Sequence, residues 1–222
     1  MPVCKQMIKG KTLIIWDWNG TLLDDRAVCI ASMNRMLARR GMPLVSETRY
    51  QELFRFPVKD YYIDLGFDFD QEPFETLSVE FIDHYRELQP AASLYNGAVD
   101  LLNAFQKQGL KQIILSAMER STLLQDVTDR GITNYFDAIL GSEDHYAHGK
   151  AAIAQDYLVS SGLVAEEIIM LGDTEHDFDV SAILGCTCIL ISQGHHDAAR
   201  LMATGAQVQK NLPGVLNFLI NP

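Results

Sequence analysis

Short segments rich in isoleucine and leucine recur along the chain, and each stops abruptly at a small, polar or acidic residue. Segments that are apolar on both faces are typical of strands in a parallel sheet covered by helices. Regular spacing of such segments over most of a chain favours one central sheet. The predicted strands are residues 12–16, 112–115, 138–140, 168–171 and 188–191.

The intervals between the later strands have helical periodicity. A glycine, the residue that commonly ends a helix, lies within two residues of the end of each interval. Strands that alternate with helices predict an α/β fold with a doubly wound, Rossmann-like parallel sheet. The predicted helices are residues 97–108, 120–130, 150–160 and 175–184.

Residues 23–89 interrupt this alternation. They contain no comparable strand segment and show helical periodicity instead, at 27–40, 47–54, 59–65 and 74–88. Roughly 65 residues is far longer than the usual strand-to-helix connection of about 2–6 residues. We therefore expect an α/β domain made of residues 1–22 and 90–222, and a helical insertion at 23–89 with a small core of its own.

The charge balance limits the partners that this chain can bind. Eighteen Lys and Arg against 29 Asp and Glu give a net charge of −11 at pH 7, which disfavours nucleic acid and anionic lipid surfaces. No stretch approaches the roughly 18 uninterrupted apolar residues of a membrane span, and the N-terminal segment lacks the apolar core of a signal peptide. We expect a cytoplasmic monomer or homodimer that binds neither nucleic acid nor membrane.

Chemically active residues stand where the predicted strands end. Asp17, Ser116 and Asp173 follow three strands, and Lys150 opens a helix. Parallel strands all end at one edge of their sheet, so these side chains should converge there. Two carboxylates, a hydroxyl and an ammonium in one crevice suggest a magnesium-assisted phosphoryl site in which Asp17 is free to act as the nucleophile.

Four short motifs sharpen this interpretation. They are DWNGTLLD at 17–24, Ser116 after 113–115, Lys150 in HGK at 148–150, and GDTEHD at 172–177. Their order and positions resemble the motifs of the haloacid dehalogenase superfamily, and the insertion resembles its helical cap. The phosphoglycolate-phosphatase-like branch is the most similar that we identify. The resemblance implies a Mg²⁺-dependent hydrolase of a small phosphorylated metabolite.

The resemblance also implies roles for individual residues. Asp17 would attack phosphorus and form an aspartyl-phosphate, which divides one difficult hydrolysis into two easier steps. Mg²⁺ would be held by the side chains of Asp17 and Asp173 and by the backbone carbonyl of Asn19. Asp177, one helical turn after Asp173, would support the metal or Lys150 from close by.

Three further residues would contact the substrate. Ser116 and the backbone amide of Ala117 would bind phosphoryl oxygens, and Lys150 would neutralise the charge that grows on them. In the insertion, Arg55, Lys59 and the Tyr61–Tyr62 pair are the charged and aromatic residues that we place nearest the entrance of the site, with Arg55 as a substrate-binding candidate. The alternative is that both charges are solvated at the surface.

Asn19 departs from the pattern of the family. The phosphatase branches resembled here usually have Asp at this position, and that Asp protonates the leaving group and later deprotonates the attacking water. An amide cannot exchange a proton at neutral pH. General acid-base assistance contributes about 10²–10⁴-fold, so Asn19 predicts slow turnover of alkyl phosphates and a preference for leaving groups that need no proton.

Three hypotheses account for Asn19. The substrate has a good leaving group, such as an acyl phosphate, an anhydride or an activated phosphonate; phosphonoacetaldehyde hydrolases of the superfamily also lack this Asp but use a cap lysine, for which Lys59 is the nearest candidate. Alternatively another group supplies the proton, with His145, His148 and His176 as candidates. In the third hypothesis catalysis is largely lost and the protein binds a phosphorylated ligand or partner.

Overall fold

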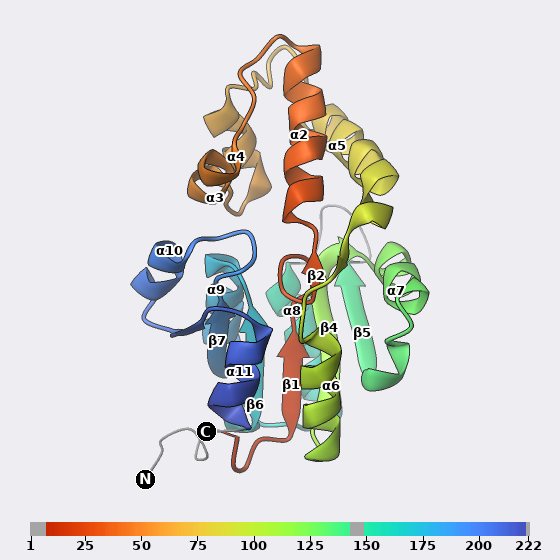
Figure 1. The fold of residues 1–222 in the computed structure, drawn as a ribbon, viewed down its shortest axis with the longest axis vertical. Coiled ribbons are helices and arrows are strands. Elements are labelled where there is room, and N and C mark those ends of the chain that lie inside the picture. Colours follow the sequence, from red (N-terminus) through yellow and green to blue (C-terminus); the bar gives the residue numbers. More distant parts are fainter. Residues whose placement is uncertain (1–7, 143–148, 221–222) are drawn as a thin grey trace.

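A six-stranded sheet forms the centre of the molecule (Figure 1). The computed structural model describes residues 8–142 and 149–220. Within them the strand order is β5-β4-β1-β6-β7-β8, and every neighbouring pair is parallel. The strands are β1 (Leu13–Trp16), β4 (Lys111–Glu119), β5 (Ala138–Ser142), β6 (Ile168–Gly172), β7 (Thr187–Ile191) and β8 (Gln207–Gln209). The predicted α/β fold is confirmed; β8, an edge strand with glutamine at both ends, lacks the apolar pattern and is not among the predicted strands.

Both faces of the sheet are covered by helices, which explains why its central strands are apolar on both faces over most of their length. Successive side chains of β1 point to opposite faces. Leu13 and Ile15 belong to the apolar cluster that includes helices α8 and α9, whereas Ile14 and Trp16 pack in the cluster with α6, α7 and α11. The helices are α6 (Ala98–Lys107), α7 (Arg120–Asp129), α8 (Lys150–Ser161), α9 (Glu175–Leu184) and α11 (Leu212–Leu219).

The register of the strands brings their polar ends together. The last residue of β1 pairs with Ile114 of β4 and with Leu171 of β6. Asp17 directly follows β1, Ser116 lies within β4, and Asp173 directly follows β6. Each of the three is within two residues of Trp16 or of the residue that pairs with it. This carboxyl edge is the place where open α/β sheets bind ligands.

A helical insertion lies above that edge (Figure 1). Its helices are α2 (Arg26–Arg39), α3 (Glu47–Leu53), α4 (Val58–Leu65) and α5 (Phe74–Leu88). The two connections to the core pair with each other as short antiparallel strands, β2 (Leu23–Asp24) and β3 (Ser93–Leu94). One apolar cluster runs from Trp16 in the sheet to Met33 and Leu77 in the insertion. The insertion is thus a cap packed on the core through a continuous apolar interior.

The remaining elements are short. They are helix α10 (Ala198–Ala203) and the 3-10 turns Gln89–Ala91, Thr133–Tyr135 and Ala165–Glu167. Among the described residues, no helix combines the length and the apolar character needed to cross a lipid bilayer.

Candidate active site

Lys150 lies between two carboxylates at the carboxyl edge of the sheet. Its Nζ is 2.5 Å from Oδ1 of Asp17, directly after β1, and 2.5 Å from Oδ1 of Asp177, in the first turn of α9. All three side chains are buried. Burial alone would lower the pKa of Lys150, but Asp17 and Asp177 raise it above its usual value. Lys150 is therefore a permanent buried cation that can offset negative charge beside Asp17.

Asp177 is fixed by the start of helix α9. It forms a capping box with Thr174, in which each side chain accepts a hydrogen bond from the other residue's backbone N–H. The Oδ2 atom of Asp177 also accepts a hydrogen bond from the backbone N–H of Asp173 at 3.1 Å. Burial would raise the pKa of Asp177, but Lys150 and the hydrogen bonds from Thr174 outweigh this effect and lower it. Asp177 is thus held as an anion that positions Lys150.

Three buried carboxylates converge at the bottom of the site. Oxygen atoms of Asp17, Asp173 and Asp177 lie within 4.8 Å of one another. Burial raises the pKa of Asp17 well above its usual range despite the opposing charge of Lys150, and burial raises the pKa of Asp173 to about 6. Three acidic groups facing one ammonium leave an excess of negative charge, so this donor set fits a hard divalent cation.

Neighbouring groups complete the set of oxygen atoms. Thr21 Oγ1 lies 3.2 Å from Oδ2 of Asp17 and 2.9 Å from Oδ1 of Asp173. In the described part of the chain no hydrogen bond is found to the backbone carbonyl of Asn19, which leaves that oxygen open to a cation. Ser116 Oγ lies 3.5 Å from Oδ1 of Asn19, on the opposite side of β1 from Asp173.

Two glycines allow the backbone to approach Asp173 closely. A Cβ atom at Gly20 or at Gly194 would overlap the carboxylate of Asp173, and Gly20 also has a φ of +75°, in the left-handed region. Beside Gly194, the backbone N–H of His195 donates to Oδ2 of Asp173 at 2.6 Å. The orientation of the Asp173 carboxylate therefore depends on glycine at positions 20 and 194, where a side chain would displace it.

The side-chain amide of Asn19 has a defined orientation. Its Nδ2 donates to Oδ2 of Asp25 at 2.8 Å and to the hydroxyl of Tyr85 at 2.9 Å. The two acceptors lie side by side, and Oδ1 faces Ser116. Asn19 therefore presents a carbonyl oxygen toward Ser116, and its amide has no acidic proton to give to a leaving group.

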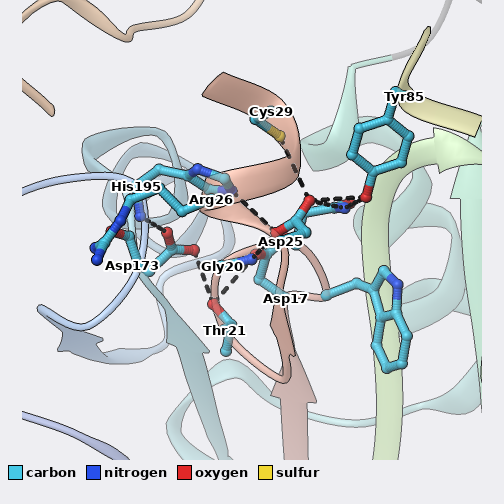
Figure 2. A network of polar contacts seen from close by, with 12 residues as sticks. Asp17, Gly20, Thr21, Asp25, Arg26, Cys29, Tyr85, Asp173 and His195 are labelled. Atoms are coloured by element: carbon cyan, nitrogen blue, oxygen red, sulfur yellow. Dashed lines mark hydrogen bonds and ion pairs between the residues drawn. The ribbon is translucent and has the colours of Figure 1, made fainter. Parts of the chain in front are cut away.

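Asp25 is the hub of this network (Figure 2). It occupies the N-cap position of α2 but makes no capping hydrogen bond there. Its Oδ1 accepts from the backbone N–H of Gly20 at 2.9 Å and lies 3.4 Å from Nε2 of His195, while Oδ2 accepts from Tyr85 at 2.7 Å. Burial would raise the pKa of Asp25, but His195, Tyr85 and Asn19 lower it. Asp25 is therefore a buried anion that binds site residues and does not cap helix α2.

His195 links the cap to the core. Its ring Nε2 faces Asp25, and its Nδ1 lies 3.0 Å from the hydroxyl of Tyr50 on α3. Burial opposes the charged form, but the contact with Asp25 prevails and raises the pKa of His195 to about 9. At neutral pH the imidazole is therefore positively charged beside Asp25 and Asp173.

Asp25, Tyr85 and His195 are site residues that the sequence analysis does not identify. Asp25 directly follows the first motif, and His195 lies four residues after β7 ends. The rule that strand ends meet at one edge points to both of these positions. Tyr85 lies 60 residues from its partner Asp25 on a cap helix, and no sequence signal marks it.

The two charged cap residues named from the sequence lie elsewhere. Arg55 forms an ion pair with Asp64 at 2.9 Å, and Lys59 lies over the rings of Phe69 and Phe74, with its Nζ 5.2 and 5.9 Å from their centroids. Neither is among the described residues that line the cavity of the site. The substrate-binding role of Arg55 stays a prediction to which this geometry adds no support.

One of the three candidate histidines can be placed. His176 lines the cavity and stacks on Phe56 with ring centroids 4.7 Å apart. Burial and the charge of Lys150 lower the pKa of His176, so it is neutral at pH 7. His145 and His148 lie outside the described residues.

A cavity of about 380 Å³ connects the cap to these residues. Asp17, Asn19, Ser116, Ala117 and Lys150 line its core side. A volume in this range is typical of small-molecule sites. The arrangement places a carboxylate, a buried ammonium and a candidate cation site at one end of a chamber roofed by the cap.

Comparison with known families agrees with this geometry. Residues 14–191 match the haloacid dehalogenase-like hydrolases. The chain belongs to this family. The match runs from β1 to β7 and includes the strand-end carboxylates, Lys150 and the whole cap. The resemblance inferred from the four motifs is therefore confirmed, and the chain is a haloacid dehalogenase-like hydrolase.

Relatives of this hydrolase have several activities. A 5'-nucleotidase of Pseudomonas aeruginosa is 28% identical over 197 residues, which cover 86% of each protein. A phosphoglycolate phosphatase of Mesorhizobium japonicum is 24% identical and covers 85% of this chain and 86% of its own. A solved haloacid dehalogenase-like hydrolase of Streptococcus pneumoniae has a TM-score of 0.76 at 23% identity, covering 95% of this chain and 99% of its own. That last similarity supports the fold.

Proposed function

We propose that this protein is a Mg²⁺-dependent phosphatase that cleaves a small phosphorylated metabolite through an aspartyl-phosphate on Asp17. The observation that carries the proposal is the contact of Lys150 with Asp17 in the lining of the cavity, beside the buried carboxylates of Asp173 and Asp177. The names of the 5'-nucleotidase and the phosphoglycolate phosphatase among its relatives also support phosphate-ester chemistry.

Each residue has one task in this mechanism. Asp17 attacks phosphorus, Lys150 offsets the negative charge on the phosphoryl oxygens, and Ser116 with the backbone at Ala117 binds those oxygens. Asp17, Asp173 and the carbonyl of Asn19 would hold Mg²⁺, which when bound keeps carboxylates ionised and offsets phosphoryl charge. The cap closes the chamber and excludes bulk water from the aspartyl-phosphate.

This phosphatase differs from the phosphoglycolate-phosphatase-like branch in its requirement on the leaving group. Asn19 has no acidic proton to give, and its Nδ2 donates to Asp25 and Tyr85. The structure thus supports a preference for leaving groups that depart as stable anions. A phosphonatase-like reaction is not favoured, because Lys59 is the only lysine of the cap, its Nζ lies over the rings of Phe69 and Phe74, and it is not among the described residues that line the cavity.

A comparison of leaving groups tests the proposal. Steady-state hydrolysis of acetyl phosphate, p-nitrophenyl phosphate and glycerol 2-phosphate is measured with MgCl₂ or with EDTA. We expect Mg²⁺-dependent turnover of the first two and a kcat/KM for glycerol 2-phosphate lower by about 100-fold, the size of missing acid catalysis. Absence of turnover on all three substrates would contradict the proposal and favour the hypothesis that the protein only binds a phosphorylated ligand.

The environment of Asp173 provides a test of the metal site. Gly194→Ala is expected to weaken Mg²⁺ binding by about 10–100-fold, because the new methyl group displaces the Asp173 carboxylate. Calorimetric titration of the metal-free protein with MgCl₂ measures the change. Gly149→Ala is the control, since Gly149 has a φ of −54° and a Cβ there meets nothing within 4 Å. Unchanged affinity in Gly194→Ala would argue against Asp173 as a ligand.

A further inference from the structure

The cap side of the cavity is lined by a dense group of aromatic and apolar side chains. They come from helices α2, α4 and α5 and from the segment around α3. The cap contributes two charged residues to the described lining: Asp25, which is buried at the end next to the core and pairs with Tyr85 and His195, and Arg86, which is exposed. The aromatic residues are Tyr50, Phe54, Phe56, Tyr61, Tyr62, Phe74, Phe81 and Tyr85. Such a surface matches a flat apolar group better than a sugar, a nucleotide phosphate chain or a carboxylic acid.

The hydroxyl groups of this lining differ in their partners. Tyr50 bonds to His195, and Tyr85 bonds to Asp25. The hydroxyl of Tyr61 is buried and has no hydrogen-bond partner among the described residues. A buried polar group without a partner is unusual in a folded protein. It suggests that a bound molecule supplies the missing partner.

Asn19, on the core side of the cavity, places a second and independent requirement on the substrate. Asn19 cannot protonate a departing oxygen, so the leaving group has to be a weak base. A phenol, with a pKa of about 10 like that of tyrosine, leaves far more easily than an alkoxide, whose conjugate acid is closer to water at about 15.7. An acyl phosphate meets this requirement too, but a small acyl group would leave the aromatic lining without a partner.

We infer that the substrate is an aryl phosphate, whose ring lies against the cap aromatics while its phosphate faces Asp17. The inference rests on the proposed phosphatase activity and specifies its substrate class. Asp17 forms a bond to phosphorus as the phosphorus–oxygen bond to the ring breaks, and the phenolate leaves with the electron pair and takes a proton from water. A water molecule then attacks phosphorus, which releases inorganic phosphate and regenerates Asp17. An apolar cavity of about 150 Å³ can already bind benzene, so 380 Å³ accommodates a ring and a phosphate.

Phe81 offers a test of this inference that leaves the reacting groups intact. It lies on α5, is partly buried, and stacks on Tyr85 with ring centroids 6.1 Å apart. Phe69 is the matched control, because it is also a partly buried cap phenylalanine packed on the same apolar cluster, but it does not line the cavity. The substitutions Phe81→Ala and Phe69→Ala therefore remove the same group from inside and from outside the proposed ring site.

The experiment compares 1-naphthyl phosphate with acetyl phosphate, in MgCl₂, for the wild type and both variants. Acetate is a weaker base than naphtholate, so leaving-group chemistry alone favours acetyl phosphate. We expect the wild type to prefer 1-naphthyl phosphate by at least about 10-fold in kcat/KM, and Phe81→Ala to lose about 10-fold on that substrate. Because Phe81 lines the cavity and stacks on Tyr85, the readout is the ratio of the two kcat/KM values, which should fall about 10-fold in Phe81→Ala and stay within about 2-fold of the wild type in Phe69→Ala.

The outcomes separate this inference from the proposed function. Turnover of acetyl phosphate without a preference for the aryl substrate would overturn the aryl-phosphate assignment and leave the phosphatase intact. Equal losses on both substrates in Phe81→Ala would also overturn it, because a ring contact affects only the aryl compound. No turnover of either substrate by the wild type would instead contradict the phosphatase itself.

Discussion

Replacing Asp17 with asparagine is expected to reduce kcat for acetyl phosphate by on the order of 10⁶-fold, the typical result of removing a nucleophile. An amide at this position can still accept a hydrogen bond from Lys150, so the architecture of the site should persist. Single-turnover assays in MgCl₂, with phosphate release followed directly, measure the loss.

The stability of the same variant separates a lost nucleophile from a damaged fold. Burial raises the pKa of Asp17, with Asp173 and Asp177 adding to the effect, so its ionised form destabilises the metal-free protein. That penalty is absent below the unfolded pKa of about 4 and grows as the pH rises toward the folded pKa. In EDTA at neutral pH, Asp17→Asn should therefore unfold at a temperature no lower than the wild type.

Asp24→Asn is the control for this prediction. Asp24 is an exposed residue on β2, close in sequence to Asp17 but outside the acidic cluster and the cavity lining. Its substitution should leave kcat unchanged. Substantial activity in Asp17→Asn would show that the attack on phosphorus does not depend on Asp17. A comparable loss in Asp24→Asn would show that the effect is not specific to position 17.

The sequence was sufficient for features that depend on local pattern and on one topological rule. Apolar segments at five of the six strands predicted the parallel sheet, and the rule that strand ends meet predicted that Asp17, Ser116 and Asp173 converge. Lys150 could be added because it opens the helix after β5. These predictions succeed because chemistry and backbone geometry coincide at the same edge of the sheet.

The contacts of individual cap residues could not be predicted from the sequence. A charged cap residue has several stable placements, and Arg55 pairs with Asp64 while the Nζ of Lys59 lies over aromatic rings. The contact of Tyr85 with Asp25 joins residues 60 positions apart, and it depends on how α5 packs over the core. Such contacts follow from tertiary packing and leave no periodic signal in the chain.

Introducing a carboxylate at position 19 creates a conflict that only the structure reveals. Nδ2 of Asn19 is 2.8 Å from Oδ2 of Asp25, so Asn19→Asp brings two carboxylates within hydrogen-bond distance. Such a pair shares a proton, and one of its pKa values rises strongly. Because the folded state then retains a proton that the unfolded state releases above a pH of about 4, the stability of Asn19→Asp should fall relative to the wild type as the pH increases.

The double substitution Asn19→Asp with Asp25→Asn is expected to remove this conflict and to increase turnover of glycerol 2-phosphate by about 10²–10⁴-fold over the wild type. It exchanges the amide and the carboxylate across one hydrogen bond, so the new carboxylate can give a proton to the alkoxide and later take one from water. The gain in Asn19→Asp alone should be smaller, since the proton shared with Asp25 hinders the second step. Steady-state assays on glycerol 2-phosphate and acetyl phosphate measure both effects.

Asn19→Ser is the control for the double substitution, because it removes the amide without adding a carboxylate and should bring no gain. If the double variant hydrolyses acetyl phosphate but gains nothing on glycerol 2-phosphate, a proton at position 19 is not what restricts the substrate. The shape of the aromatic cavity would then be the stronger determinant, since it excludes a small polar alcohol independently of the protonation step. A gain confined to alkyl phosphates would instead show that Asn19 and Asp25 together set the leaving-group requirement.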